Sequence, residues 1–410
     1  MRIAMVSEHA SPLATIGGAD GGGQNVHVAA LAEALVRRDH EVTVYTRRDD
    51  ADLPAQVVTA SGYVVEHVPA GPPKEIPKDT LLPYMPQFGL YLAARLRVNP
   101  VDVLHSHFWM SGLASVPAAR EVAVPLIHTF HALGAVKRRH QGSRDTSPPN
   151  RLQLERRLCR EVGHVIATCT DEVRELTRMR LPRDRVSVVP CGVDVSAFRP
   201  DGPVAVRRGP RLLIVGRLVE RKGVDDAIRA LALVPDAELV VAGGPLAEDL
   251  DVDPEVARLR RVAAVWGVTE RVLFLGRVSR AAMPALLRSA DVVLAVPWYE
   301  PFGIVPLEAM ACGRPVVACA VGGLSDTVVD GRTGILVPPR NPARLADSLN
   351  RLLADPDLRR TYGNAGLARA RARYSWDRVA TNSEAVYERA VAATGDSVRA
   401  EAYSVAEASS

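Results

Sequence analysis

Short apolar runs alternate along the chain with stretches in which apolar residues recur every three or four positions. Within residues 25–38, Val28, Leu31, Ala32 and Leu35 have the spacing of one helix face. The apolar runs that we interpret as strands of the first half are 3–7, 41–46, 101–105, 125–129, 162–168 and 186–189. Strands that alternate with helices indicate a parallel sheet covered by helices.

This alternation restarts after a polar segment that contains Pro and Gly, residues 199–210. The second set of expected strands comprises 212–215, 238–242, 272–275, 292–296, 316–320 and 334–337. We therefore predict an α/β protein with two doubly wound, Rossmann-like domains, 1–203 and 204–372, which are joined by a short hinge and face each other across a cleft. A C-terminal helix is expected at 373–390 and a flexible tail at 391–410.

The composition is that of an ordinary globular protein, with 410 residues, 47% hydrophobic and 24% charged, and a net charge of +4. The small net charge and the lack of a zinc-finger or aromatic RNA-binding motif argue against nucleic acid as a partner. The first apolar run is too short for a signal peptide, and no run approaches the ~20 residues of a membrane span. Five cysteines without CxxC spacing suggest reduced thiols, so we expect a cytoplasmic protein.

Two acidic residues bracket a Phe-Gly pair after the fourth expected strand of the second domain. Glu300 lies in the loop at the carboxyl end of that strand, and Glu308 lies about two turns into the following helix. Ligands bind at this edge of a parallel sheet. The carboxylates can accept hydrogen bonds from sugar hydroxyls, while the backbone amides of Phe302 and Gly303 can face an anion. The motif therefore fits a nucleotide sugar, although a solvated loop acid and a surface helix acid would have the same spacing.

The loop that follows the first strand of each domain is suited to phosphate. Residues 17–23 contain five glycines, which let the backbone approach a ligand. Their spacing is neither the dinucleotide GxGxxG nor a P-loop, so NAD binding and ATP hydrolysis are rejected, and a flexible loop is the alternative. In the second domain, Arg217 and Lys222 can neutralise a leaving diphosphate without a metal, with a solvated basic turn as the alternative.

Histidines gather at the ends of two expected strands of the first domain. His105 and His107 end one strand, and His128 and His131 end the next. Imidazoles at such an edge can donate to sugar hydroxyls or share a proton in catalysis, but each can also be structural. Because there is no HExxH motif and no His/Cys/Asp cluster with zinc spacing, we expect neither a metal nor a cofactor.

Motifs in a characteristic order occur at 21–26, 70–72 with 76–78, 105–107, 131–134 before Lys137, 190–194, 216–218, 222–223, 300–308 and 322–323. In this order they resemble the retaining nucleotide-sugar glycosyltransferases of family four, which have the GT-B fold. Within that family the chain looks most similar to the sucrose-phosphate synthases and to the inositol-phosphate N-acetylglucosaminyltransferase of mycothiol synthesis. The resemblance extends from the first strand to Tyr387.

The resemblance implies a role for each matching position on the donor side. Arg217 and Lys222 would hold the donor diphosphate, and Glu308 would bind the nucleotide ribose. Glu300 would contact the 3- and 4-hydroxyls of the sugar, and His131 the region of its 6-hydroxyl. The remaining donor-side positions would be Gly22 and Gly23, which let their loop approach, Arg277 near the base, and the backbone of Phe302, Gly303 and Ile304.

The family also implies the chemistry. Transfer would occur on the front face with retention, and the leaving diphosphate would accept the proton of the acceptor while Arg217 and Lys222 stabilise its charge. His131 and Glu300 complete the expected catalytic residues, and Glu300 with Glu308 would not act as a pair of glycosidase acids. The first domain would bind the acceptor and the second the nucleotide sugar. The domains would close to exclude water, and the C-terminal helix would cross back to the first domain.

The expected donor group is a hexose or an N-acetylhexosamine carried by UDP, with guanosine as the other base considered. The expected acceptor is a small hydroxylated sugar or cyclitol, and its candidate ligands are Asn25, Lys78, His107 and Lys137. The basic region 137–160 indicates an anionic acceptor or a phospholipid surface, or else a solvated helix face with ion pairs. An aminocyclitol acceptor is also considered, although it would not suit a basic pocket.

Other interpretations keep the fold and change the function. A sugar-nucleotide epimerase is one, and a phosphorylase-like enzyme is another that lacks a recognisable lysine context for pyridoxal phosphate. A third is a non-catalytic sugar-nucleotide-binding subunit, against which the intact charged positions argue. Peripheral contact with a membrane and a homodimer are the further associations considered.

Overall fold

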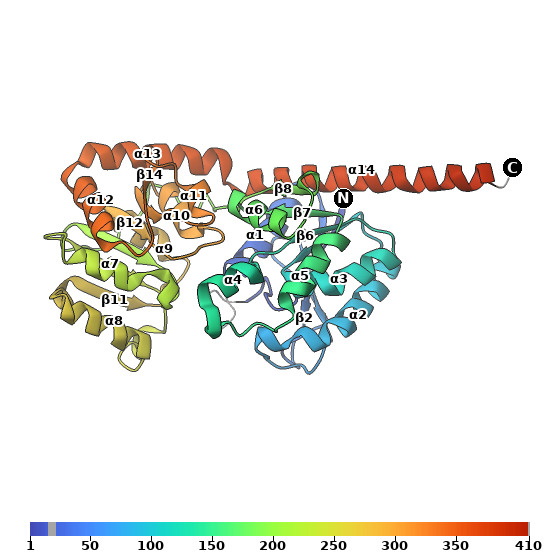
Figure 1. Ribbon diagram of the computed structural model, residues 1–410, viewed down its shortest axis with the longest axis horizontal. Coiled ribbons are helices and arrows are strands. Elements are labelled where there is room, and N and C mark those ends of the chain that lie inside the picture. The colour runs from blue at the N-terminus through green and yellow to red at the C-terminus, as the bar shows by residue number, and fades with distance from the viewer. Residues whose placement is uncertain (15–21, 409–410) are drawn as a thin grey trace. The chain divides into compact units, whose positions relative to one another are not determined.

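The computed structural model describes residues 1–14 and 22–408. The chain divides into two compact units (Figure 1), unit 1 with Met1–Pro190 and Val379–Ser410, and unit 2 with Cys191–Arg378. The boundary expected after residue 203 thus lies inside unit 2. The physical reason is that Val193 and Phe198 pack into the apolar core of unit 2. The Val193 N–H also donates to the carbonyl oxygen of Tyr374 at 2.7 Å.

Unit 1 is built on a sheet whose strand order, within the described residues, is β3-β4-β2-β1-β5-β6-β7-β8. Neighbours pair in parallel except β3 with β4. The strands are β1 (Arg2–Val6), β2 (Glu41–Arg47), β3 (Gln56–Val58), β4 (Val64–Val68), β5 (Val103–His107), β6 (Leu126–Thr129), β7 (His164–Ala167) and β8 (Val186–Val188). Met5 of β1 lies between Val44 and His105 of its neighbours. The winding reverses between β1 and β5, and ligands bind at the carboxyl ends of strands at such a reversal.

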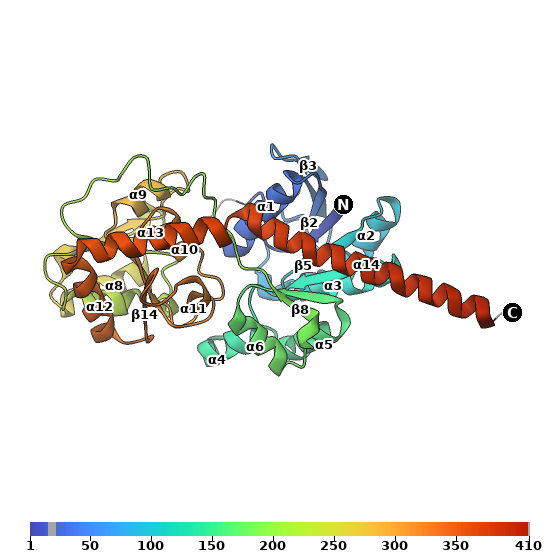
Figure 2. The same ribbon diagram turned by 90° about the horizontal axis from the view of Figure 1, so that it is seen from above.

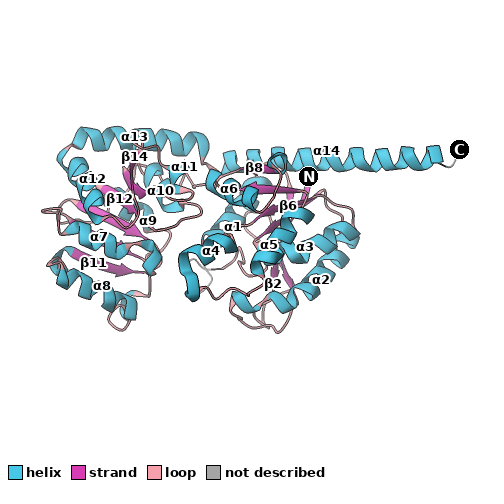
Figure 3. Cartoon of the chain, in the orientation of Figure 1, coloured by secondary structure: helices cyan, strands magenta, loops and turns pink. Residues whose placement is uncertain are grey.

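Helices flank this sheet (Figure 3). They form because their apolar residues return to one face, as Phe88, Leu92 and Leu96 do in α2, where all three are buried. The helices of unit 1 are α1 (Gly23–Val36), α2 (Met85–Val98), α3 (Trp109–Glu121), α4 (Gly134–Gln141), α5 (Arg151–Glu161) and α6 (Thr170–Arg178), with short 3-10 turns η1 (Lys78–Thr80), η2 (Leu82–Tyr84), η3 (Gly142–Arg144) and η4 (Arg183–Arg185).

Unit 2, all of whose residues are described, has a parallel sheet with the order β11-β10-β9-β12-β13-β14. Its strands are β9 (Arg211–Val215), β10 (Glu238–Ala242), β11 (Val272–Gly276), β12 (Val292–Ala295), β13 (Val316–Cys319) and β14 (Gly334–Val337). Its helices are α7 (Val224–Leu231), α8 (Pro254–Val265), α9 (Met283–Ser289), α10 (Ile304–Ala311), α11 (Leu324–Thr327), α12 (Pro342–Ala354) and α13 (Pro356–Arg373), with η5 (Glu220–Lys222), η6 (Ala247–Asp249) and η7 (Thr269–Arg271). The winding reverses between β9 and β12.

Each strand of unit 2 contributes to two apolar cores because successive side chains point to opposite faces. Leu212 and Ile214 of β9 pack in one core with residues of α7, α8 and α12. Leu213 packs in the other core with residues of α9 and α10. Burial on both faces explains why these strands are continuous apolar runs and not alternating ones.

The helix α14 (Trp376–Ala408) joins unit 1 from residue 379 onward (Figure 2). The Tyr387 side chain is fully buried there, and its hydroxyl lies 2.7 Å from His105 Nδ1 of β5. Glu384 accepts hydrogen bonds from Arg38 and lies 3.0 Å from His40 Nε2. The helix includes residues that the sequence suggested would form a flexible tail. Among the described residues, none of the helices combines the length and the apolar character that a membrane crossing needs.

Replacing Tyr387 by Ala is expected to lower the free energy of unfolding by about 3–5 kcal/mol, as truncation of a large buried aromatic side chain does. The loss of stability has two causes: a cavity forms where the ring was, and His105 loses a hydrogen-bond partner. Leu90→Ala in α2, at a position 71% exposed, is the control and should cost less than about 0.5 kcal/mol. Urea unfolding followed by circular dichroism measures both, and equal costs would contradict the docking of α14 on unit 1.

Candidate active site

The carboxyl edge of the unit 2 sheet brings two predicted residues of opposite charge into contact. Strands β9 and β12 are neighbours in the sheet, so the loops that follow them meet although 78 residues separate Lys222 from Glu300. Lys222 Nζ donates to Glu300 Oε2. The side chains are 23% and 15% exposed. The residue expected to hold the diphosphate therefore touches the residue expected to hold the sugar.

Glu300 is held in its ionised form. Burial by itself would raise its pKa, but the Lys222 ammonium, the Arg221 guanidinium and the Phe302 N–H together keep the pKa of Glu300 below its usual value. An ionised carboxylate only accepts hydrogen bonds. Glu300 is thus suited to binding hydroxyl groups and not to donating a proton.

Close backbone packing fixes the loops that follow β9, β12 and β13 at this edge. Gly223 has φ +69°, and a Cβ there would lie 2.1 Å from the carbonyl oxygen of Val296, just after β12. Gly322 has φ +48°, and a Cβ there would lie 2.2 Å from the carbonyl oxygen of Glu300. Glycine is required at both positions for the backbones to approach this closely. The predicted segment of Phe302, Gly303 and Ile304 follows, with Gly303 at φ +80° as the N-cap of α10.

Glu308 lies on α10 and is 4% exposed. Burial raises the pKa of Glu308, and the ion pair with Arg280, whose Nη1 lies 2.5 Å from Glu308 Oε1, opposes this only in part. The Arg280 guanidinium also lies over the Phe198 ring at 4.7 Å. Sequence reasoning missed Arg280. The available signal was its position, because it follows β11 at the same sheet edge three residues after the predicted Arg277.

Arg217 and Arg277 are exposed residues of the loops that follow β9 and β11. Both loops lie at the carboxyl edge of the sheet that also carries Lys222 and Glu300. The Arg277 backbone N–H donates to the carbonyl oxygen of Pro245 at 2.7 Å, which fixes the start of its loop. The structure thus gathers the charged donor-side candidates of unit 2 at one edge.

The glycine-rich loop of unit 1 lies partly outside the described residues, which exclude 15–21. Gly22 is the N-cap of α1, and Gly23 is its first residue. Asn25, predicted to bind the acceptor, closes this turn: its Oδ1 accepts from the Gly22 N–H at 3.0 Å, and its Nδ2 donates to the Ser11 carbonyl oxygen at 3.0 Å. The Asn25 side chain therefore positions Gly22 and Gly23.

Buried imidazoles line the carboxyl ends of β5 and β6. His107 Nδ1 lies 2.9 Å from His131 Nε2, and His131 has φ +59°. His105 and His128 have structural partners, since His105 contacts Tyr387 and Thr129 and His128 contacts Ser106.

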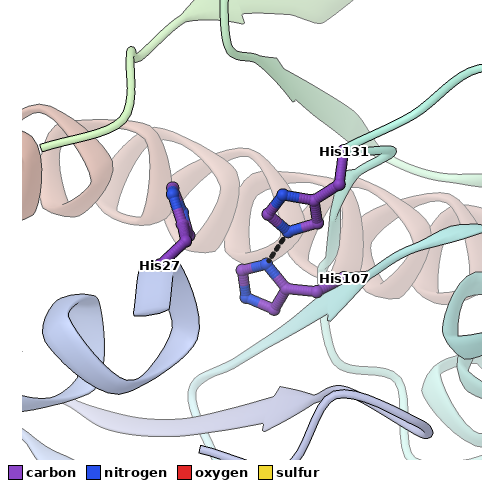
Figure 4. A group of neighbouring side chains, drawn as sticks. All are labelled: His27, His107 and His131. Carbon is purple, nitrogen blue, oxygen red and sulfur yellow. Dashed lines mark hydrogen bonds between the residues drawn. The ribbon is translucent and has the colours of Figure 1, made fainter. Parts of the chain in front are cut away.

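A further histidine, His27 on α1, completes a group with His107 and His131 (Figure 4). The His27 ring centroid lies 5.0 Å from that of His131 and 5.8 Å from that of His107. Burial lowers the pKa of His27 to about 4 and, together with the neighbouring imidazoles, lowers the pKa values of His107 and His131 well below the ordinary value. The rings are thus neutral at pH 7. Sequence reasoning missed His27 because its place in the group depends on the packing of α1 against the sheet.

A buried ion pair supports the loop that carries His131. Arg151 and Glu155, one turn apart on α5, pair at 2.8 Å, and both side chains are almost fully buried. Arg151 Nη2 donates to the Ala132 carbonyl oxygen at 2.6 Å, and the Gly134 N–H donates to Glu155. These bonds hold the backbone on the C-terminal side of His131.

The predicted acceptor-side lysines of unit 1 share an acidic neighbour. Lys137 Nζ lies 3.4 Å from Asp79, 3.1 Å from Asp145 and 2.9 Å from Ser147 Oγ. Burial opposes ionisation of Asp79, but hydrogen bonds and the charges of Lys137 and Lys78 outweigh it and lower its pKa. The two lysines thus lie within electrostatic reach of one carboxylate.

Three arginines of the remaining basic region form ion pairs within the described part of unit 1. Its arginines pair with acidic side chains in Arg139 with Glu175, Arg151 with Glu155, and Arg157 with Glu161. Of the alternatives that the sequence left open, these contacts favour the helix face with ion pairs for Arg139, Arg151 and Arg157.

Known proteins resemble this chain over nearly its whole length. The family described as "Glycosyltransferase Family 4" matches residues 21–197, and "Glycosyl transferases group 1" matches residues 203–369. A D-inositol 3-phosphate glycosyltransferase of Acidothermus cellulolyticus is 37% identical over 95% of this chain and 91% of its own. One of Xylanimonas cellulosilytica is 38% identical over 95% of this chain and 97% of its own.

Solved structures share the fold. A sucrose-phosphate synthase from Thermosynechococcus elongatus superposes with a TM-score of 0.85 at 32% identity, covering 96% of this chain and 99% of that one. HepE of Anabaena, solved in complex with UDP and glucose, superposes with a TM-score of 0.72 at 21% identity over 95% of this chain and all of that one. The fold class predicted from the sequence is confirmed. The chain belongs to the family-four glycosyltransferases, which have the GT-B fold.

Proposed function

We propose that this glycosyltransferase moves a hexose or an N-acetylhexosamine from a UDP-sugar to a hydroxyl of a small, phosphorylated sugar or cyclitol, with retention and without a metal in the transfer step. Relatives named for D-inositol 3-phosphate and for sucrose-phosphate synthesis support the acceptor class. The complex of HepE with UDP and glucose is in keeping with a uridine donor.

The observation that carries the proposal is the Lys222–Glu300 contact at the reversal point of the unit 2 sheet. A nucleotide sugar carries both a diphosphate anion and hydroxyl groups on the adjoining ring. The diphosphate can replace Glu300 as the partner of the Lys222 ammonium. The sugar hydroxyls can then donate hydrogen bonds to the ionised Glu300. Both charges of the pair then keep a partner, so binding avoids the cost of leaving either one buried alone.

The bonds that change involve the anomeric carbon. Its bond to the leaving phosphate oxygen breaks while a bond to the acceptor oxygen forms on the same face, and the acceptor proton passes to the leaving phosphate. Lys222 and Arg217 stabilise the charge that develops on that phosphate. Glu300 orients the sugar and takes no proton, in agreement with its lowered pKa. His131, Gly22 and Gly23 are the further residues that we propose for the donor sugar.

The cationic candidates for the acceptor phosphate are Lys78 and Lys137. Lys137 already contacts Asp79 and Asp145, so an incoming phosphate would replace carboxylates as its partner. Other basic side chains nearby, such as Arg139, are committed to acids. His107 and Asn25 remain candidates for the acceptor side, Asn25 by positioning the backbone before α1.

Calorimetric titration with UDP, GDP, ADP and their hexose and N-acetylhexosamine conjugates tests the donor. Mass spectrometry of the products with phosphorylated and unphosphorylated cyclitols then tests the acceptor. Failure of every nucleoside diphosphate to bind at millimolar concentration would overturn the proposal. An isomerised sugar nucleotide formed without an acceptor would indicate an epimerase instead.

Lys222→Ala is expected to weaken UDP-sugar binding about 10- to 100-fold, because one charge-assisted hydrogen bond of ~1.5–3 kcal/mol is lost. The control is Lys74→Ala, which changes an exposed lysine of unit 1. Isothermal titration of both variants, each first checked for folding by circular dichroism, provides the comparison. Wild-type affinity in Lys222→Ala would remove Lys222 from the donor site.

Glu308→Gln is expected to reduce the preference for UDP over 2′,3′-dideoxy-UDP, because a carboxylate that accepts from ribose hydroxyls gains nothing from a nucleotide without them. The wild type should prefer UDP about tenfold or more, as hydrogen bonds to charged groups contribute ~1.5–3 kcal/mol. Glu270→Gln, a change in the surface turn η7, is the control. If Glu308→Gln keeps the wild-type preference for UDP over 2′,3′-dideoxy-UDP, the assignment of Glu308 to the ribose is wrong.

Lys137→Gln is expected to raise KM for a phosphorylated acceptor about tenfold or more while leaving an unphosphorylated acceptor nearly unchanged, since only the former offers an anion. Arg157→Gln, from the same basic region but with a side chain 56% exposed, is the control. Initial-rate kinetics with both acceptors give the ratio. An equal rise in KM for the two acceptors would show that Lys137 does not bind the phosphate.

A further inference from the structure

One tryptophan of unit 2, Trp298, lies just before Glu300 in the loop that follows β12. Its backbone N–H donates to the carbonyl oxygen of Arg221 at 2.8 Å. In return, Arg221 Nη1 donates to the carbonyl oxygen of Tyr299 at 3.3 Å. Because Arg221 and Lys222 are neighbours in η5, these bonds join the two loops directly beside the Lys222–Glu300 pair.

A guanidinium group lies over the face of the Trp298 indole. Its carbon atom, Arg340 Cζ, is 3.8 Å from the ring centroid, well inside the ~6 Å within which a cation and an aromatic ring attract each other. Arg340 follows β14 and has φ +57°. A residue with a side chain is strained in this region of backbone conformation and stays there only when its surroundings hold it. The contact with Trp298 is one that holds Arg340 in place.

The edge of the same indole faces a buried carboxylate. Asp226 lies in the first turn of α7 and is 6% exposed. Burial and the neighbouring Asp225 raise the pKa of Asp226, whereas Arg229, the Trp298 N–H and Arg340 partly offset this rise. Even so, Trp298 Nε1 and Asp226 Oδ2 are both buried without a hydrogen-bond partner in unit 2, all of whose residues are described. Buried polar atoms are almost always paired, so a small shift of the loop that joins these two would satisfy both.

Donor binding removes the side-chain link between the two loops. In the proposed complex the diphosphate takes the place of Glu300 beside Lys222, so the ion pair no longer holds the loops together. Glu300 has to stay in place to accept from the sugar hydroxyls, since a displacement of about 1 Å can cost roughly a hundredfold in rate. The contacts of Trp298 with Arg221 and Arg340 use none of the atoms that the donor is proposed to contact, so donor binding leaves them intact.

We propose that Trp298, held by Arg340 and Asp226, is a positioning residue of the donor site. It keeps the loop that carries Glu300 fixed against the segment that carries Lys222 while the donor replaces their ion pair. The inference rests on the proposed function and adds to it three residues that touch neither the diphosphate nor the sugar. Sequence spacing could not reveal the group, because its members follow β9, β12 and β14 and lie far apart along the chain.

Ligand titrations separate this role from general stability. Glu300 is proposed to contact the sugar, so a displaced Glu300 should raise the Kd of a UDP-sugar relative to the Kd of UDP, which has no sugar. For Trp298→Leu we expect this ratio to rise about tenfold, the lower end for loss of a hydrogen bond to a charged group. Arg340→Gln should raise the ratio roughly two- to fivefold, as loss of an exposed cation–π contact does. Arg340→Lys keeps the cation and should stay near the wild-type ratio.

The titrations use the full chain with UDP, UDP-glucose and UDP-N-acetylglucosamine, after circular dichroism has shown that each variant is folded. Trp266→Leu is the matched control, because Trp266 is a 45% exposed tryptophan at the end of α8, and it should leave the ratio unchanged. If Trp298→Leu does not fold, the two Arg340 variants decide, because they change an exposed residue. Wild-type ratios in Trp298→Leu and Arg340→Gln refute the inference. A wild type that binds none of the three ligands refutes the proposed function instead.

Discussion

The ion pair of Lys222 with Glu300 is the interaction on which the donor site of unit 2 depends. Both side chains are largely buried at the carboxyl edge of a parallel sheet, where a lone charge would be costly. Each charge makes the other tolerable, and each remains available to a ligand that offers a replacement. Gly223 serves this contact, because a side chain there would separate the loops that carry the two charges, and Gly322 lets the loop after β13 pack against the backbone of Glu300.

The side chains at the carboxyl edges of the two sheets differ in charge. Unit 2 gathers ionised groups, with Glu300 kept charged by its cationic neighbours. Unit 1 gathers imidazoles that burial keeps neutral, among them His107 and His131. A charged edge suits a diphosphate and its sugar hydroxyls, whereas neutral imidazole nitrogens suit hydroxyl groups. The same Rossmann-like topology therefore supports different chemistry because different residues follow the same strands.

The basic region of unit 1 shows why charge counted along a sequence is a weak guide to a ligand. Arg139, Arg151 and Arg157 are each engaged by a carboxylate, and the Arg151–Glu155 pair holds the backbone beside His131. Lys137 differs, because it contacts two acids and a hydroxyl that a phosphate could displace. Selectivity for an anionic acceptor would then rest on few side chains, in keeping with a net charge of only +4.

The sequence by itself determined the alternation of strands and helices, the doubly wound class and the edge at which ligands bind, because these follow from local periodicity and from where polar residues follow apolar runs. It missed β3 and β4 of unit 1, which are short strands at one edge of the sheet. It also singled out Lys222, Glu300 and Glu308 individually. Only the tertiary structure decided their partners: Arg280 for Glu308, His27 beside His131, and residues 191–203 within unit 2. Such contacts depend on strand order and on the packing of helices against the sheet, which bring together residues far apart in the chain and leave no local pattern.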